Sequence, residues 1–103
     1  MKIVAVCACP TGVAHTYMAK AALEKAAKKL GHQIKVEAQG ALGIENEITP
    51  AEVKEADAVI LAIEVGIAKR ERFDGRPCVT IPVQAAVKSP ETLLKKLEEK
   101  LKS

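Results

Sequence analysis

The chain has 103 residues, enough for one domain with a single hydrophobic core and too few for two domains of ordinary size. Hydrophobic residues make up 49% and aromatic residues only 2%, so aliphatic side chains must form the core. The net charge of +3 is mild and comes without interleaved aromatic residues, which argues against nucleic-acid binding. No apolar run reaches the roughly 20 residues of a membrane span, and a signal peptide is not recognised, so we expect one cytoplasmic domain over 1–103.

The first half of the chain predicts two strands with a helix between them. Residues 2–7 form a short β-branched run that is typical of a buried parallel strand. Over 13–30 the apolar residues recur at helical spacing, and Gly31 ends that helix. Residues 33–38 alternate between polar and apolar, which predicts a strand at an edge of the sheet, and 39–46 predicts a glycine-containing loop.

The second half predicts two further strands and two helices. Thr49-Pro50-Ala51-Glu52 supplies an N-cap, a first-turn proline and a capping-box glutamate, so a short helix begins there. The uninterrupted apolar run 58–63 is typical of a central buried strand. Residues 66–75 predict a polar loop with a helical turn, and 77–81 predict a short fourth strand. Ser89 and Pro90 begin a final helix whose leucines form one stripe: Leu93, Leu94, Leu97 and Leu101.

Alternating strands and helices predict an α/β fold, with a four-stranded parallel sheet and helices on both faces, of the Rossmann-like or flavodoxin-like kind. We expect the strand order 2-1-3-4. In that order the first strand has a neighbour on each side, and its carboxyl end lies where open α/β sheets bind ligands. The segment after the first strand is therefore the first candidate for a functional site.

That segment places the Cys9 thiol between the end of a strand and the start of a helix. The first N–H groups of a helix have no partners within it, and the helix dipole presents positive charge, so an anion is favoured there. We expect this field to lower the pKa of Cys9, which makes Cys9 the candidate catalytic nucleophile for a phosphoryl group. The predicted phosphate-binding residues supply backbone amides and hydroxyl donors around it: Pro10, Thr11, Gly12, Val13, Ala14, His15 and Thr16.

The spacing of Cys9 and His15 matches the loop of cysteine phosphatases, with histidine where those enzymes need arginine. A histidine offers at most one donor at that position, and the loop has no clear aspartate to activate water. We therefore expect a thiophosphate that hydrolyses slowly, as a carrier requires. No metal or organic cofactor is required, because two distant histidines and scattered cysteines do not make a metal cluster.

Five stretches carry a resemblance to a known family: Ala8–Met18, Val36–Gly40, Gly43–Asn46, Ala56–Ile60 and Arg72-Phe73. Together they resemble the fructose-family enzyme IIB domain of the bacterial phosphoenolpyruvate-dependent sugar phosphotransferase system, over essentially the whole chain. The resemblance implies a four-stranded parallel sheet. It also implies that Cys9 receives a phosphoryl group from a phosphohistidine on a IIA protein or domain. Cys9 would then deliver it, as phosphocysteine, to fructose or a related sugar bound in the membrane IIC component.

Two departures from the family pattern are Glu64, where aspartate is usual, and Cys7, where threonine is common. We expect neither residue to contact Cys9. Cys78 lies in a strand, so we expect it to fill the core, and we expect His32 to be a solvated residue at a helix end.

Other residues are expected at the same edge of the sheet as Cys9. Gly40 and Gly43 follow the second strand and would lie beside the Cys9 loop. Arg70 and Arg72 follow the third strand and are placed to meet acidic patches on a donor protein.

Two alternative functions stay open at this point. The first is a low-molecular-weight cysteine phosphatase, which the missing arginine disfavours. The second is a non-catalytic redox or binding module, in which Cys9 would be unreactive or paired with Cys7 in a strained disulfide. The sequence does not name the sugar, because selection is expected in the membrane partner.

Overall fold

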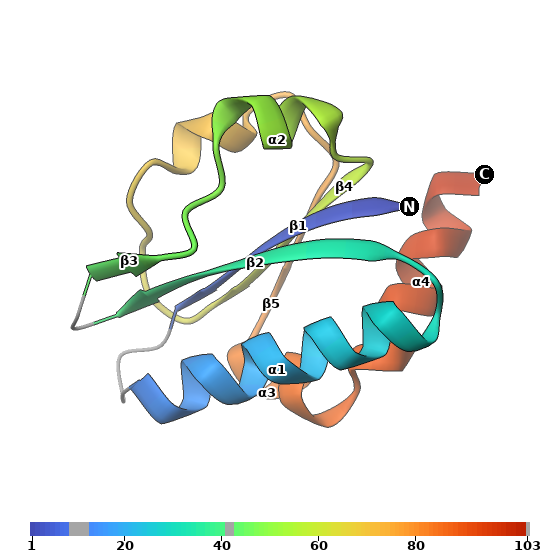
Figure 1. The fold of residues 1–103 in the computed structure, drawn as a ribbon, viewed down its shortest axis with the longest axis horizontal. Coiled ribbons are helices and arrows are strands. Elements are labelled where there is room, and N and C mark those ends of the chain that lie inside the picture. The colour runs from blue at the N-terminus through green and yellow to red at the C-terminus, as the bar shows by residue number, and fades with distance from the viewer. Residues whose placement is uncertain (9–12, 41–42, 103) are drawn as a thin grey trace.

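The structure is a computed structural model and describes residues 1–8, 13–40 and 43–102. A single sheet separates two groups of helices (Figure 1). The elements in chain order are β1 (Lys2–Ala8), α1 (Val13–Lys29), β2 (Gln33–Gly40), β3 (Gly43–Glu45), α2 (Pro50–Glu55), β4 (Ala58–Ile63), the 3-10 helix η1 (Arg70–Phe73), β5 (Cys78–Ile81), α3 (Val83–Lys88) and α4 (Pro90–Lys102).

The sheet is mixed and mostly parallel, with five strands in the order β3-β2-β1-β4-β5. Strands β2, β1, β4 and β5 are parallel and follow one another as predicted, so that part of the topology is confirmed. The prediction of a four-stranded, all-parallel sheet is wrong, because β3 pairs antiparallel with the end of β2. A strand of three residues carries no periodicity, and here it lies within the segment 39–46 that predicts a loop.

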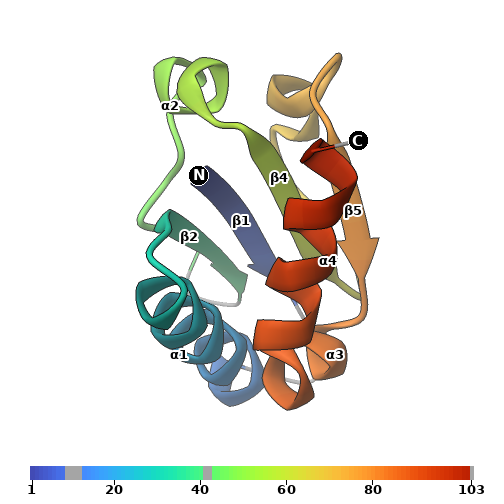
Figure 2. The same cartoon turned by 90° about the vertical axis from the view of Figure 1, so that its right-hand side faces the viewer.

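Apolar layers cover both faces of the sheet, as predicted. Alternate residues of β1 point to opposite faces, so Ile3, Ala5 and Cys7 pack under α1, α3 and α4, while Val4 and Val6 face α2 and η1. Figure 2 shows α1 and α3 on the side of the sheet opposite α2, with α4 running across the strands. None of the helices within 13–40 and 43–102 is long and apolar enough to span a membrane.

Helix α3 is an element that the sequence analysis did not predict. It begins directly after Pro82, its N-cap, and is only six residues long. Val83 and Ala86 are buried in the layer under α1. Six residues cover fewer than two turns, so the apolar spacing that identifies a helix has no room to repeat.

The capping box at the start of α2 is confirmed. The Thr49 hydroxyl accepts a hydrogen bond from the Glu52 amide at 3.2 Å, and the Glu52 carboxylate accepts one from the Thr49 amide at 2.9 Å. We expect Thr49→Ala to lower the free energy of unfolding by about 1 kcal/mol, because it leaves an N–H group at the start of the helix without its partner. Denaturant unfolding measures this, with Thr80→Ala on the exposed side of β5 as the control. Equal stability of the two variants would contradict the role of the cap.

Candidate functional site

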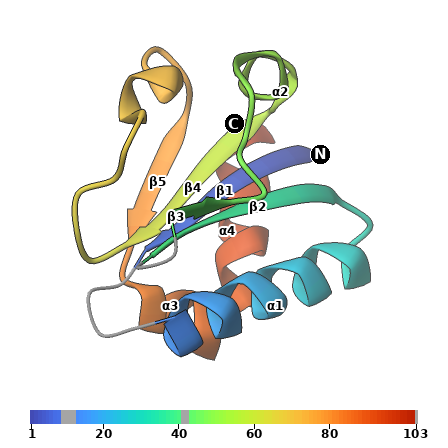
Figure 3. The same cartoon turned by 60° about the vertical axis from the view of Figure 1, so that its left-hand side comes forward.

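The carboxyl end of β1 lies in the middle of the sheet. Ala8 pairs with Gln39 of β2 on one side and with Ile63 of β4 on the other. The next residue in the chain is Cys9, and α1 begins at Val13 (Figure 3). The predicted junction of a central strand and a helix is therefore confirmed. The predicted roles of Cys9, Pro10, Thr11 and Gly12 fall outside the described residues.

The amino end of α1 presents the positive end of the helix dipole. Its first turn has no acidic residue, and its last turn carries Lys28 and Lys29, which match the negative end. The first N–H groups of the helix have no partners within it, so this turn favours an anion. Val13, Ala14 and His15 contribute their backbone to the turn, and the roles predicted for their side chains fall outside the described residues.

Thr16 is the predicted phosphate-binding residue whose side chain the structure describes. It is 2% exposed, and its Oγ1 has no hydrogen-bond partner among residues 1–8, 13–40 and 43–102. A buried hydroxyl without a partner costs on the order of 1–3 kcal/mol, so proteins seldom leave one unsatisfied. The phosphate-binding role of Thr16 stays a prediction.

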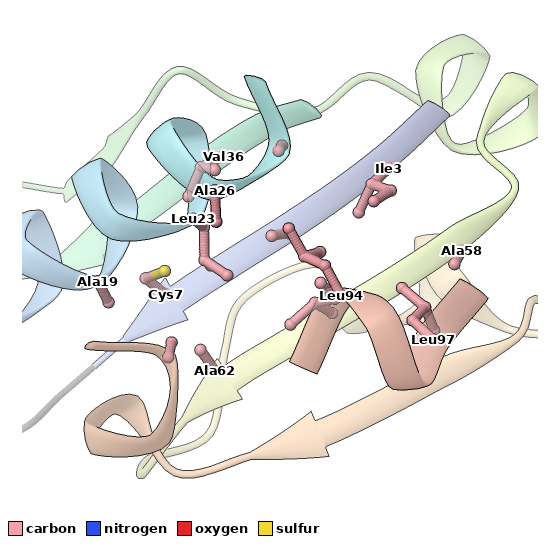
Figure 4. Packing of buried hydrophobic residues seen from close by; sticks show 14 of the residues in the cluster. Ile3, Cys7, Ala19, Leu23, Ala26, Val36, Ala58, Ala62, Leu94 and Leu97 are labelled. Carbon is pink, nitrogen blue, oxygen red and sulfur yellow. The ribbon is translucent and has the colours of Figure 1, made fainter. Parts of the chain in front are cut away.

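Cys7 is completely buried in the layer between β1 and the helices, with Ala19 and Leu23 (Figure 4). Burial, with a smaller contribution from the Glu24 carboxylate, raises the pKa of Cys7 to about 12, although Lys20 opposes the change. A neutral, enclosed thiol is a poor nucleophile and a poor partner for disulfide exchange. The geometry therefore disfavours the redox alternative in which Cys7 pairs with Cys9.

Cys78 is exposed, so the prediction that it fills the core is wrong. On the short edge strand β5 the inward positions are taken by Val79 and Ile81, and Cys78 points the other way. Cys78 pairs with Val59 near the start of β4, whereas the Cys9 segment follows the ends of the parallel strands. Cys78 thus lies toward the amino ends of the parallel strands, away from the end of β1 that precedes Cys9 in the chain.

We expect alkylation near neutral pH to modify Cys78 but not Cys7 in the folded protein, and to modify both after unfolding. The folded state holds the Cys7 proton up to about pH 12, against an ordinary value of 9.0, so the free energy of unfolding should fall as the pH rises above 9.0. Peptide mapping by mass spectrometry reads out the first expectation, and urea unfolding at several alkaline pH values reads out the second. Modification of Cys7 as fast as Cys78 would contradict both.

Arg72 is not available to a donor protein, so that prediction is wrong. Its guanidinium forms two hydrogen bonds to the Glu37 carboxylate, at 2.8 and 2.9 Å, and the two side chains are 7% and 0% exposed. The Arg72 guanidinium also lies 4.8 Å from the centre of the Phe73 ring. Arg70, by contrast, is exposed, as the prediction requires.

Glu37 keeps its charge although it is buried in β2. Burial alone would raise its pKa, but hydrogen bonds from Arg72, Gln39 and the Ile48 amide outweigh burial and hold the pKa of Glu37 below its ordinary value. The Ile48 amide donates at 2.8 Å and the Gln39 amide at 2.6 Å. Sequence reasoning missed Glu37 and Gln39 as organising residues. One signal was available: Glu37, Gln39 and Arg72 all lie within the stretches that resemble the family.

The hairpin of β2 and β3 lies beside the end of β1, and the predicted place of Gly40 and Gly43 beside the Cys9 loop falls outside the described residues. Gly40 directly follows Gln39, the residue that pairs with Ala8, and Gly43 has a φ of 99°, which a side chain would strain. The Tyr17 hydroxyl in α1 donates a hydrogen bond to the Glu45 carboxylate in β3, and this bond raises the pKa of Tyr17. The amino end of α1 is therefore tied to the hairpin.

His32 is not a solvated helix-end residue, so that prediction is wrong. Its side chain is 10% exposed, and its Nε2 contacts the Glu98 carboxylate of α4. This contact joins the turn after α1 to α4, and it lies at the amino ends of the parallel strands, away from the segment that follows β1. His32 therefore has a structural role.

Comparisons with known proteins point to one family. The family described as "PTS system, Lactose/Cellobiose specific IIB subunit" matches residues 4–96. The "PTS system fructose-like EIIB component 2" of Escherichia coli is 51% identical over 100 residues, which are 97% of this chain and 94% of that protein. The "PTS system fructose-like EIIB component 1" of the same organism is 42% identical over 102 residues, 99% of this chain and 94% of that protein.

Solved structures agree with the sequence relatives. The solution structure of an enzyme IIB subunit of the PTS system from Escherichia coli has a TM-score of 0.92 at 42% identity, covering 97% of this chain and 93% of that one. A crystal structure of a domain from the fructose-specific IIABC component of Borrelia burgdorferi has a TM-score of 0.87 at 46% identity, covering 92% and 90%. The shared fold therefore extends over nearly the whole chain.

Proposed function

Because this chain belongs to the enzyme IIB components of the sugar phosphotransferase system (PTS), in the fructose-like class, and is thus a phosphotransferase that carries phosphoryl groups, we propose that Cys9 is the residue that carries them. The donor is a phosphohistidine on a IIA protein or domain. The acceptor is fructose or a related sugar held by the membrane IIC component. The domain, 1–103, works at the cytoplasmic side as one unit.

The chemistry consists of two displacements at phosphorus. The Cys9 thiolate attacks the phosphohistidine, so an S–P bond forms, the P–N bond breaks, and the histidine nitrogen keeps the electron pair and takes a proton. A sugar hydroxyl then attacks the phosphocysteine, so an O–P bond forms, the S–P bond breaks, the hydroxyl proton passes to water, and Cys9 returns to the thiolate. Amides at the start of α1 and the Thr16 hydroxyl donate hydrogen bonds to the phosphoryl oxygens.

One observation carries the proposal. The central strand β1 ends at Ala8, α1 begins at Val13 with no acidic residue in its first turn, and the buried Thr16 hydroxyl near that end has no partner among the described residues. Cys9 stands in the chain between these elements, whereas Cys7 is enclosed and Cys78 lies toward the amino ends of the parallel strands. These facts support Cys9 over both other thiols.

The test is to map the phosphoryl group. The chain is incubated with phosphoenolpyruvate and the upstream phosphohistidine proteins, and the labelled residue is located by mass spectrometry with fragmentation of each peptide. We expect one phosphoryl group, on the peptide that contains Cys9, and its loss when the sugar and the IIC component are added. A label on His15 or on Cys78 would overturn the assignment, and steady release of inorganic phosphate without sugar would favour the phosphatase alternative.

A further inference from the structure

The segment between β4 and η1 borders the carboxyl end of β1, and we call residues 64–69 the strap. At its start, the Glu64 amide donates a hydrogen bond to the Ala8 carbonyl oxygen at 3.0 Å. Near its other end, Ala68 contacts Gln39, which lies on β2, the strand on the far side of β1 from β4. The strap therefore passes the end of β1 and is held on both sides of it (Figure 3).

Gln39 holds the strap with both ends of its side-chain amide. Its Oε1 accepts a hydrogen bond from the Ala68 amide at 2.8 Å, and its Nε2 donates to the Ala68 carbonyl oxygen at 3.1 Å. The two bonds engage one residue's backbone in the way that a neighbouring strand would. Asparagine is one carbon shorter and cannot reach both groups, and glutamate lacks the donor.

Gln39 is itself held in place by the buried ion pair. Its Nε2 donates to Glu37 at 2.6 Å, and Glu37 is fixed by Arg72. Arg72 also donates from Nε to the Lys69 carbonyl oxygen at 2.7 Å. The network thus fixes the end of the strap through two consecutive residues, Ala68 and Lys69.

The strap reaches the edge of the sheet where the candidate site lies. Gln39 pairs in register with Ala8, the residue before Cys9, and the strap residues Glu64, Val65 and Gly66 are exposed. Their backbone follows the end of β4, next to β1. A change in the position of this segment therefore alters the surroundings of the end of β1, the strand that Cys9 follows in the chain.

We propose that Gln39 is a positioning residue for phosphoryl transfer, because its side-chain amide fixes the strap beside the end of β1. The inference rests on the proposed function of Cys9. It assigns no contact between Gln39 and the phosphoryl group. Its effect is on geometry, and a displacement of about 1 Å near a reacting group can lower a rate by up to about a hundredfold.

The test compares Gln39→Asn and Gln39→Met with Gln33→Asn, a control on the same strand at the opposite edge of the sheet. With phosphorylated IIA as the donor, we expect the Gln39 variants to lower the maximal rate of transfer on the order of tenfold, with KM for the donor within about twofold of wild type. Amide hydrogen exchange at Ala68 should become faster in both Gln39 variants. The Gln33→Asn variant should match wild type in all three measurements.

The inference and the proposed function fail in different ways. If wild-type protein takes up no phosphoryl group on Cys9, the proposed function is wrong. If wild type is phosphorylated on Cys9 and both Gln39 variants transfer at the wild-type rate, the positioning role alone is wrong. A loss that lies wholly in KM would also overturn it, since Gln39 would then affect docking. Thermal unfolding of each variant keeps the comparison to temperatures at which all of them are folded.

Discussion

Replacing Cys9 by serine is expected to abolish phosphoryl transfer to the sugar, with a loss of at least about a thousandfold. The variant keeps the shape of the residue but replaces a thiol, which the start of α1 can hold as an anion, by a hydroxyl that stays protonated near neutral pH. Removal of the attacking group from a site that acts as a unit costs several orders of magnitude. The rate of sugar phosphorylation with phosphorylated IIA and IIC-containing membranes measures the effect.

The control for this experiment is Cys78→Ser, because Cys78 is an exposed thiol toward the amino ends of the parallel strands. It should transfer at the wild-type rate. Phosphoryl label that persists in Cys9→Ser would show that another residue is the acceptor. Circular dichroism of both variants checks that the loss comes from chemistry and not from unfolding.

Replacing Arg72 by methionine is expected to lower the free energy of unfolding by about 3–5 kcal/mol, because it leaves the Glu37 charge buried without its partner. Glu37 is 0% exposed and Arg72 is 7% exposed, so water cannot take over the role of the guanidinium. The double variant Glu37→Met/Arg72→Met replaces the ion pair by two apolar side chains. It should recover much of this loss, because the buried charge is then removed. Urea unfolding measures both variants.

The pH dependence separates this explanation from simple loss of packing. In wild type the pKa of Glu37 is held below its ordinary value of 4.5, so the pair stabilises the protein above that pH and its contribution is lost as the pH falls through the folded-state value. In Arg72→Met, burial favours the neutral carboxyl, so the difference in stability from wild type should shrink on acidification. Lys29→Met, which breaks an exposed ion pair with Glu91, should stay near wild type. A pH-independent loss in Arg72→Met would contradict the buried-charge explanation.

Much of the fold could be predicted because its signals are local. The apolar run at 58–63, the capping residues Thr49 and Glu52, and the strand-to-helix junction around Cys9 each lie within a few neighbouring residues. The predicted order of the four parallel strands was also correct, because the preference for short, right-handed connections between parallel strands leaves few alternative orders. β3 and α3 were missed because each is too short to show a period.

The sequence by itself indicated the family and the candidate residue: a thiol that follows a predicted central strand and precedes a predicted helix, in a pattern that resembles the phosphoryl-carrying family to which the chain belongs. Tertiary structure alone decided which polar residues are buried and paired. Glu37 and Arg72 are 35 residues apart, and Gln39 and Ala68 are 29 apart, so no local pattern links them. The physical reason is that desolvation and hydrogen bonding depend on which side chains the folded sheet brings together. The sequence predicted Arg72 as a surface contact for a donor protein, but in the folded protein its charge offsets the cost of burying the Glu37 carboxylate.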